Sequence, residues 1–353
     1  MKHYGDQMLE AKFEKLFKKL VNSKSIHECT MHIENANGDF NWNMGYGGRT
    51  IDSPMFLASV TKLFTTTCIL NLKIQGKLAF EDNLSKYFSS EIIKGVHIYK
   101  GVDYSNDLTV GNLLFQNTGF PDVFSVGKYP LHKKMVYEDF TATLEDYVKI
   151  AKDNKKLFAP GSVGKAHYSD LNFEMMGKII EKLENSSLHE AFKKYVFDPL
   201  ELKNTYLPEN EKDFIPNVYY KNIKMKCYKT IRSIPASGGG ISTSNDTMKF
   251  LKAFFGGKLF EKGIFNELRK FATIQYGYPL AQYGGGFMRL NISGIGTMFK
   301  CKGEMIGHIG MTGTYAYYYP EKDLYFVGDY NQFATPSRTF TIPLNLAKIV
   351  SNY

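Results

Sequence analysis

Strand-like sequence lies near both ends of this chain and is missing from its middle. Residues 28–34 and 39–46 alternate like strands, and the Asn37-Gly38 pair between them is typical of a hairpin turn. Further strand patterns follow late in the chain, at residues 284–292, 305–309, 314–319 and 325–330. Successive strands joined by short connections pair in the antiparallel sense. The order therefore predicts an α+β fold whose antiparallel sheet takes strands from both ends of the chain.

Helical patterns flank and interrupt these strands. Residues 7–21 repeat apolar side chains at helical spacing, which predicts an amphipathic helix that packs against the sheet. Residues 342–350 predict a closing helix, in which Pro343 is tolerable only in the first turn. Helical periodicity also appears at residues 144–152 and 172–183.

The order of these elements predicts two structural units. Residues 1–79 and 231–353 are expected to form a mixed α/β sheet domain, and residues 80–230 an inserted helical lobe without a strand system of its own. We expect the active site in the cleft between the two, since ligand pockets often form between such units.

Composition and charge exclude several functional classes. The chain is 43% hydrophobic and 15% aromatic, as a globular protein is. Its net charge of +9 comes from scattered lysines rather than from basic clusters interleaved with stacking aromatics, so no nucleic-acid partner is expected. No stretch approaches the length of a membrane span, and the first residues hold no apolar segment of a secretion signal. A cytoplasmic protein acting on a small-molecule or short-peptide substrate is expected, and its oligomeric state stays open.

Cysteine and histidine spacing gives no sign of a metal site. Cys29, Cys68, Cys227 and Cys301 are widely separated, with no C-x-x-C pair, which predicts buried, reduced thiols without disulfides or zinc. The eight histidines show no H-E-x-x-H or comparable ligand spacing. No metal and no cofactor are expected.

The motif with the most chemical content is Ser59-Val60-Thr61-Lys62. It opens a predicted helix that runs to about Lys73, and positions three residues apart share a helix face. The Lys62 amine can therefore lie beside the Ser59 hydroxyl, near the positive end of the helix dipole. A serine becomes a good nucleophile when a neighbouring base takes its proton. Ser-x-x-Lys is also the first signature of penicillin-binding proteins and serine β-lactamases.

Further motifs follow this one in order. They are the run Gln-Gly-Lys-Leu near residues 75–87, the stretch Gln-Asn-Thr-Gly-Phe-Pro at 116–121, Tyr-Ser-Asp-Leu-Asn at 168–172, Ser-Gly-Gly-Gly at 237–240, and Gly-His-Ile-Gly-Met-Thr-Gly at 307–313. Together with Ser-x-x-Lys they resemble the serine β-lactamase and penicillin-binding protein superfamily, on the side of class C β-lactamases, D-amino-peptide hydrolases and esterases. The resemblance runs from about residue 50 to about residue 330 and implies the same fold as the periodicity.

The resemblance implies a role for each matching residue. Ser59 is expected to be the nucleophile, Lys62 its base, and Tyr168 a proton shuttle. The backbone N–H groups of Ser59 and Met311 are expected to stabilise the oxyanion. Gly310 is expected to let a substrate backbone come close to the strand edge.

The chain departs from the family pattern at three positions. Asp170 stands where Asn is commoner, and it either pairs with Lys62 and holds it charged, or caps the following helix while Asn172 supplies the amide. His308 replaces the usual Lys, and it either binds a substrate carboxylate when protonated or hydrogen-bonds when neutral. Ile309 replaces the usual Thr.

These residues predict a serine hydrolase that acts through an acyl-enzyme on an ester or amide. The residues agree best with an esterase or a D-amino-acid peptidase, with weak β-lactamase activity possible. His308 and Ile309 are expected to bind a β-lactam carboxylate less tightly than the usual Lys and Thr would. The alternative is a non-catalytic relative that keeps the fold and binds a ligand. The intact Ser59, Lys62 and Tyr168 argue against that alternative.

Overall fold

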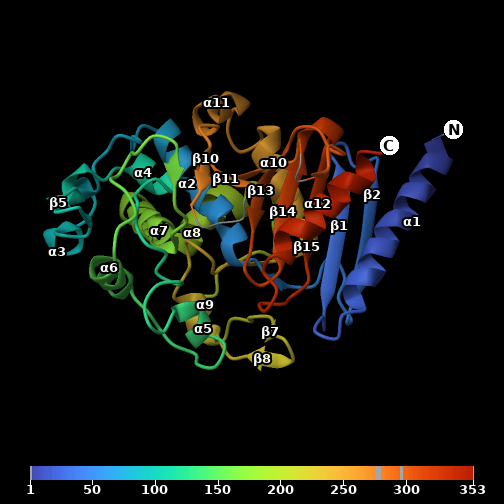
Figure 1. Ribbon diagram of the computed structural model, residues 1–353, viewed down its shortest axis with the longest axis horizontal. Coiled ribbons are helices and arrows are strands. Elements are labelled where there is room, and N and C mark those ends of the chain that lie inside the picture. Colours follow the sequence, from blue (N-terminus) through green and yellow to red (C-terminus); the bar gives the residue numbers. More distant parts are fainter. Residues whose placement is uncertain (1, 276–279, 295–296, 353) are drawn as a thin grey trace.

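A large sheet forms the centre of the molecule within the residues that the computed structural model describes, 2–275, 280–294 and 297–352. Its strands are β1 (Cys29–Asn35), β2 (Asn41–Tyr46), β6 (Lys165–Ala166), β10 (Ala272–Ile274), β11 (Ala281–Tyr283), β12 (Met288–Asn291), β13 (Glu304–Ile309), β14 (Thr314–Tyr319) and β15 (Leu324–Asp329). They lie in the order β2-β1-β15-β14-β13-β12-β11-β10-β6 (Figure 1). Only the β6–β10 pair in this described sheet is parallel, so the predicted antiparallel sheet is confirmed.

Strands from the two ends of the chain pair near one edge of this sheet. β1 pairs with β15 over six residues, and Ile33 lies opposite Phe326. β1 and β2 form the predicted hairpin, with Ile33 opposite Trp42. The first and last strands of the chain, β1 and β15, are thus neighbours. The strand patterns at both ends of the sequence predicted a sheet of this composition.

Helices from the chain ends cover both faces of the sheet. They are α1 (Lys2–Val21), α10 (Ser244–Gly256) and α12 (Arg338–Val350). Every residue of β15 is buried, so both of its faces are covered. α12 packs on β14 and on α1, and α10 packs on β1, β14 and β15 (Figure 1). None of the helices in the described part of the chain is long and apolar enough to cross a bilayer.

Pro343 lies deeper in α12 than expected. The helix begins at Arg338, so Pro343 is its sixth residue and lies in the second turn. The first four N–H groups of a helix have no partner within it, whereas the sixth has one. Pro343 therefore removes one hydrogen bond from α12, and its placement in the first turn was wrong.

The middle of the chain combines helices with many turns and loops, and it contains short strands that the sequence did not indicate. The remaining helices are α2 (Lys62–Ile74), α3 (Ser90–Ile93), α4 (Val110–Leu114), α5 (Leu131–Lys134), α6 (Leu144–Asp153), α7 (Asp170–Glu184), α8 (Leu188–Phe192), α9 (Tyr228–Arg232) and α11 (Phe265–Leu268). Two-stranded pairs form between β4 (Ile98–Tyr99) and β5 (Val102–Asp103), and between β7 (Val218–Tyr220) and β8 (Ile223–Met225). β6 also joins the main sheet, so the expectation of a lobe without strands is corrected. These strands are two or three residues long, too short for an alternating pattern to show.

The predicted strand at residues 284–292 is also corrected. Only β12, residues 288–291, is a strand in this range, and a glycine turn before it separates β12 from β11. Gly286 in this turn has φ of 87°, and a Cβ at its position would lie 2.3 Å from Thr66 Oγ1 of α2. The chain therefore reverses where the backbone comes close to α2. The division of the chain into two domains at residues 80 and 230 stays a prediction.

A small second sheet places the start of α2 beside the main sheet. β3 (Met55–Phe56) pairs with β9 (Ile241–Ser242). The Leu57 N–H donates to the Gly240 carbonyl at 2.9 Å, and Thr314 Oγ1 of β14 donates to the Phe56 carbonyl at 2.7 Å. These bonds hold the segment before Ser59 between the glycine-rich turn and the start of β14.

Candidate active site

Ser59 lies in a tight turn at the start of a helix. The 3₁₀ turn Ala58–Thr61 leads directly into α2. Ala58 has φ of 45°, a left-handed conformation that is uncommon for a residue with a side chain. Such conformations cluster at functional sites, where the surrounding structure holds them in place. The turn thus presents Ser59 at a cavity rather than burying it in the helix.

Lys62 is fully buried, and its amine contacts three oxygen atoms. Nζ lies 3.0 Å from Ser59 Oγ, 2.6 Å from Asp170 Oδ1 and 2.6 Å from the carbonyl oxygen of Ser237. An ammonium group has three N–H donors, and each finds an acceptor here. The predicted neighbourhood of Ser59 and Lys62 is thus present, and the site satisfies the charged form of the amine.

Asp170 adopts the first of its two expected arrangements. Its carboxylate forms an ion pair with Lys62, and the side chain is only 13% exposed. Asp170 is the first residue of α7, while Ser169 is the N-cap, with no side-chain capping bond. The capping role is therefore not the one that the structure shows.

Asn172 points away from Lys62. Its amide nitrogen donates to Gln116 Oε1, and its Oδ1 accepts a hydrogen bond from Thr118 Oγ1 at 2.9 Å. Gln116 Oε1 also accepts from the Ser169 N–H at 2.9 Å. Asn172 is fully buried in this network, so it fixes the segment 168–170 instead of offering its amide to a substrate.

Tyr168 lies between Ser59 and His308. Its ring centroid is 4.9 Å from Lys62 Nζ and 6.1 Å from the His308 ring. Burial raises the pKa of Tyr168 well above 10, the Asp170 charge raises it further, and a hydrogen bond with Ser59 works in the opposite direction. The phenol is therefore protonated at neutral pH and can donate a proton.

His308 is buried, and its surroundings favour one of the two roles expected for it. Its Nδ1 lies 2.8 Å from the Ile309 carbonyl oxygen, and its Nε2 lies 3.2 Å from the Tyr283 hydroxyl. Burial and the nearby Lys62 lower the pKa of His308 to about 3. Of the two roles expected for His308, these surroundings favour the neutral, hydrogen-bonding ring over the protonated ring that binds a carboxylate.

Gly310 faces the protein itself. A Cβ on Gly310 would lie 2.6 Å from the Leu57 carbonyl oxygen and 2.9 Å from Ala58 Cβ. Contacts below 3.0 Å force a displacement, so only glycine lets the nucleophile turn pack on the end of β13. The close approach expected for a substrate backbone is made here by residues 57 and 58.

Met311 follows Gly310 and lines the cavity in front of Ser59. Its N–H has no hydrogen-bond partner within the described residues. Backbone N–H groups that face a reaction site can stabilise a developing oxyanion. The position of Met311 is therefore compatible with the oxyanion role expected from the sequence.

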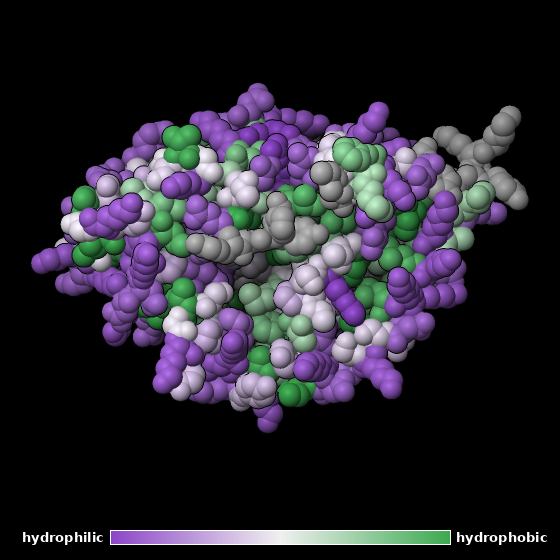
Figure 2. Space-filling view, viewed as in Figure 1, coloured by the Kyte–Doolittle hydropathy of each residue, from purple (hydrophilic) through white to green (hydrophobic). Residues whose placement is uncertain are grey.

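The cavity at Ser59 has a volume of about 530 Å³ and a mainly apolar lining. Ile274, Met288, Ile309, Met311 and Phe340 contribute apolar side chains, and no Lys or Arg of the described chain lines it. Pale and green residues gather around the middle of the face seen in Figure 2, and purple residues dominate its margin. The lining favours an uncharged, apolar group.

A family model described as Beta-lactamase matches residues 36–349. The chain belongs to the Beta-lactamase family. It is 26% identical over 227 residues to the D-alanyl-D-alanine-carboxypeptidase/endopeptidase AmpH of Escherichia coli (strain K12), a match that covers 64% of this chain and 54% of that protein. The chain thus spans about half the length of the curated relatives it matches.

Solved structures show that this Beta-lactamase family member has the fold expected of it. A D-amino acid amidase from Ochrobactrum anthropi SV3 superposes with a TM-score of 0.78 at 16% identity, covering 98% of this chain and 99% of that one. EstCE1, a hydrolase with promiscuous acyltransferase activity, superposes with a TM-score of 0.79 at 17% identity, covering 99% and 100%. At these identities the likeness shows the fold alone, and these neighbours are hydrolases.

Three residues of the site in this family member were not found by sequence reasoning. Asp122 lines the cavity, and burial together with the Asp170 charge raises its pKa. Glu174 and Ser237 lie behind Lys62. Ser237 begins the glycine-rich stretch already noted, and Asp122 directly follows the 116–121 motif. Their positions next to these motifs could have indicated that both residues lie near the site. Glu174 had none beyond its position one turn after Asp170.

Proposed function

We propose that the protein is a serine hydrolase that cleaves esters or amides through an acyl-enzyme on Ser59. The observation that carries this proposal is the contact of 3.0 Å between Ser59 Oγ and the buried amine of Lys62, beside Tyr168 and at the edge of an apolar cavity. A nucleophile in contact with a base, which is in turn oriented by a third group, is the arrangement that covalent catalysis requires.

The proton path follows from these contacts. When Lys62 is neutral, it takes the proton of Ser59 as Oγ attacks the substrate carbonyl carbon. The oxyanion faces the N–H groups of Ser59 and Met311. Tyr168 then gives its proton to the leaving oxygen or nitrogen, the acyl–leaving-group bond breaks, and the proton gained by Lys62 passes to the Tyr168 oxygen. Water attacks the acyl-enzyme by the same path and releases the acid and free Ser59.

The cavity supports neutral, apolar substrates. His308 is uncharged at neutral pH, Ile309 offers no hydroxyl, and no Lys or Arg of the described residues lines the cavity. A substrate carboxylate placed there would lose its hydration without gaining a charged partner. We therefore favour esterase activity over β-lactam hydrolysis.

A second candidate is a D-amino-acid amidase or peptidase, and two polar side chains around the site favour it. The Asp122 carboxyl lines the cavity at Ser59, where it can form a hydrogen bond with a substrate amine. An adjoining cavity of about 410 Å³ shares Met311 and is lined by Lys133, which can face a carboxylate. A short peptide carries both an amine and a carboxylate. The amidase and carboxypeptidase names among the relatives agree with this candidate.

The test is covalent labelling of Ser59. The protein is incubated separately with p-nitrophenyl butyrate and a penicillin, and its intact mass is measured. We expect the mass to rise by one acyl group, and Ser59→Ala to abolish both the adduct and turnover. Ser85→Ala serves as the matched control and should behave as wild type. Ser85 is an exposed serine in the turn Leu84–Lys86 and does not line the cavity at Ser59. An adduct that persists in Ser59→Ala would overturn the assignment.

A further inference from the structure

Ser237 connects Lys62 to a second carboxyl group behind it. The Ser237 carbonyl oxygen accepts from Lys62 Nζ at 2.6 Å, and the Ser237 N–H donates to Glu174 Oε1 at 2.8 Å. Glu174 lies one helical turn after Asp170 on α7, so the two carboxyl groups share a face of that helix. α7 therefore holds Lys62 twice, directly through Asp170 and indirectly through Glu174 and Ser237.

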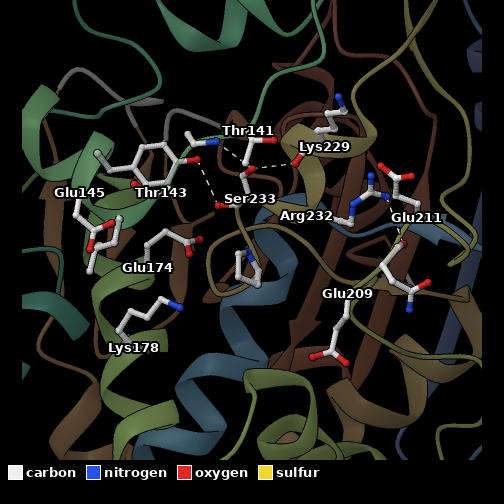
Figure 3. Close-up of a pocket in the computed structure, with 15 residues that line it drawn as sticks. Thr141, Thr143, Glu145, Glu174, Lys178, Glu209, Glu211, Lys229, Arg232 and Ser233 are labelled. Carbon is white, nitrogen blue, oxygen red and sulfur yellow. Dashed lines mark hydrogen bonds between the residues drawn. The ribbon is translucent and has the colours of Figure 1, made fainter.

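Glu174 does not face the reaction cavity. It is 7% exposed, and it lines a different cavity, of about 610 Å³, next to α6 and α9. In Figure 3 its side chain extends from α7 toward the segment that carries Ser233. It is not among the residues that line the cavity at Ser59. Any effect of Glu174 on the reaction must therefore pass through Ser237.

The segment around Ser237 is packed tightly between α2 and α7. Thr65 Oγ1 of α2 donates to the Ala236 carbonyl at 2.7 Å. On the other side, a Cβ on Gly177 of α7 would lie 2.6 Å from Ala236 Cβ. Glu174 supplies the acceptor for the next N–H of this segment. This N–H belongs to the peptide unit before Ser237 Cα, and the carbonyl that contacts Lys62 belongs to the unit after it. A shift of the first unit would therefore move the carbonyl through the shared Cα atom.

We propose that Glu174 is a positioning residue for Lys62, holding the Ser237 carbonyl so that the amine is aimed at Ser59. The inference rests on the proposed function, in which Lys62 takes the Ser59 proton. Without the carboxyl oxygen, the buried Ser237 N–H has no acceptor, and an unsatisfied buried donor is costly. The segment then turns to find another acceptor, and Lys62 follows its remaining partner, Asp170, away from Ser59.

Substitutions of Glu174 distinguish the need for a hydrogen-bond acceptor at the Ser237 N–H from the need for a negative charge there. Glu174→Gln keeps an oxygen acceptor at the same reach and removes the charge, so kcat for p-nitrophenyl butyrate should stay within about threefold of wild type. Glu174→Ala removes the acceptor, and kcat should fall about 10²-fold with KM nearly unchanged, the scale of a small misplacement of a catalytic group. Lys178→Ala is the matched control, since Lys178 lines the same outer cavity and pairs with Glu181. It should behave as wild type.

Crystal structures of the variants give a readout that does not depend on turnover. The distance from Lys62 Nζ to Ser59 Oγ should remain near 3.0 Å in Glu174→Gln and lengthen in Glu174→Ala. If Glu174→Ala does not fold, Glu174→Asp replaces it, because its carboxylate is one methylene too short to reach Ser237. Wild-type kcat in Glu174→Ala, or an equal loss in Glu174→Gln and Glu174→Ala, would overturn the proposal. Absence of Ser59-dependent labelling in the wild type would instead refute the proposed function, while the measured distances would still decide the positioning role.

Discussion

At the scale of single residues, the decisive contact is the ion pair between Lys62 and Asp170. The carboxylate lies 2.6 Å from the amine that must be neutral to act as a base. Removing one partner of a buried ion pair leaves the other charge without compensation. Asp170 therefore keeps the buried amine of Lys62 paired and in place beside Ser59.

Tyr168→Phe should harm amide cleavage more than ester cleavage. The phenol is protonated at rest, and an amine leaving group needs its proton, whereas p-nitrophenolate departs without one. We expect a loss of about 10²–10⁴ in kcat/KM for a p-nitroanilide, the usual range for general acid–base help. The loss for the matching p-nitrophenyl ester should be smaller. Equal losses for both substrates would exclude leaving-group protonation as the main role.

His308 should make the fold sensitive to acid. Its pKa falls to about 3 in the folded protein from about 6.5 in the unfolded chain, so between these values only the unfolded chain binds the proton. The stability that the neutral ring contributes is present above pH 6.5 and is lost as the pH falls toward 3. Urea denaturation of wild type and His308→Gln from pH 7 to 4 should show the wild type losing more free energy of unfolding. Parallel curves would contradict the buried, neutral state.

At the scale of secondary structure, the nucleophile turn depends on the strand beside it. The first residue of the 3₁₀ turn Ala58–Thr61 has a left-handed conformation. This residue, Ala58, and the preceding Leu57 pack directly on Gly310, which follows β13. The backbone hydrogen bond from the Leu57 N–H to the Gly240 carbonyl fixes the other side of the turn. The start of α2 is thus shaped by β9 and β13, not by α2 itself.

Gly310→Ala should displace this turn. The new methyl group would meet the Leu57 carbonyl oxygen, a backbone atom that cannot move alone, and overpacking of this kind costs about 1–3 kcal/mol. We expect that loss in the free energy of unfolding by urea, and slower acylation of Ser59. Gly256→Ala is the control, because a Cβ there has no neighbour within 4 Å. Similar behaviour of the two variants would mean that the turn does not depend on the space at Gly310.

At the scale of the whole molecule, the cavity is built from distant parts of the chain. Ser59 comes from the first quarter, Tyr168 from the middle, and Ile309 and Phe340 from the last strands and helix. Ser59 reaches this cavity because the residues before it pack on Gly310, directly after β13, and bond to Gly240. The resulting space is apolar and holds no fixed cation among the described residues, which sets the class of substrate it favours.

Activated esters should therefore be turned over far better than β-lactams. A β-lactam carboxylate would meet a neutral His308 and the apolar Ile309, while a butyryl group fits the apolar lining. Measuring kcat/KM for p-nitrophenyl butyrate and nitrocefin on one preparation decides between them. A nitrocefin value equal to or above the ester value would restore the β-lactamase interpretation.

The sequence by itself determined the sheet assembled from both ends, the helices on it and the neighbourhood of Ser59 and Lys62. These follow from local periodicity and from an i, i+3 spacing, which are properties of adjacent residues. Only the tertiary structure decided that Asp170 pairs with Lys62, that Asn172 turns away, that His308 is uncharged and that Glu174 stands behind Ser237. Each of these depends on burial and on partners far away in the chain, and a pKa or a side-chain direction is set by that three-dimensional surrounding rather than by neighbours in sequence.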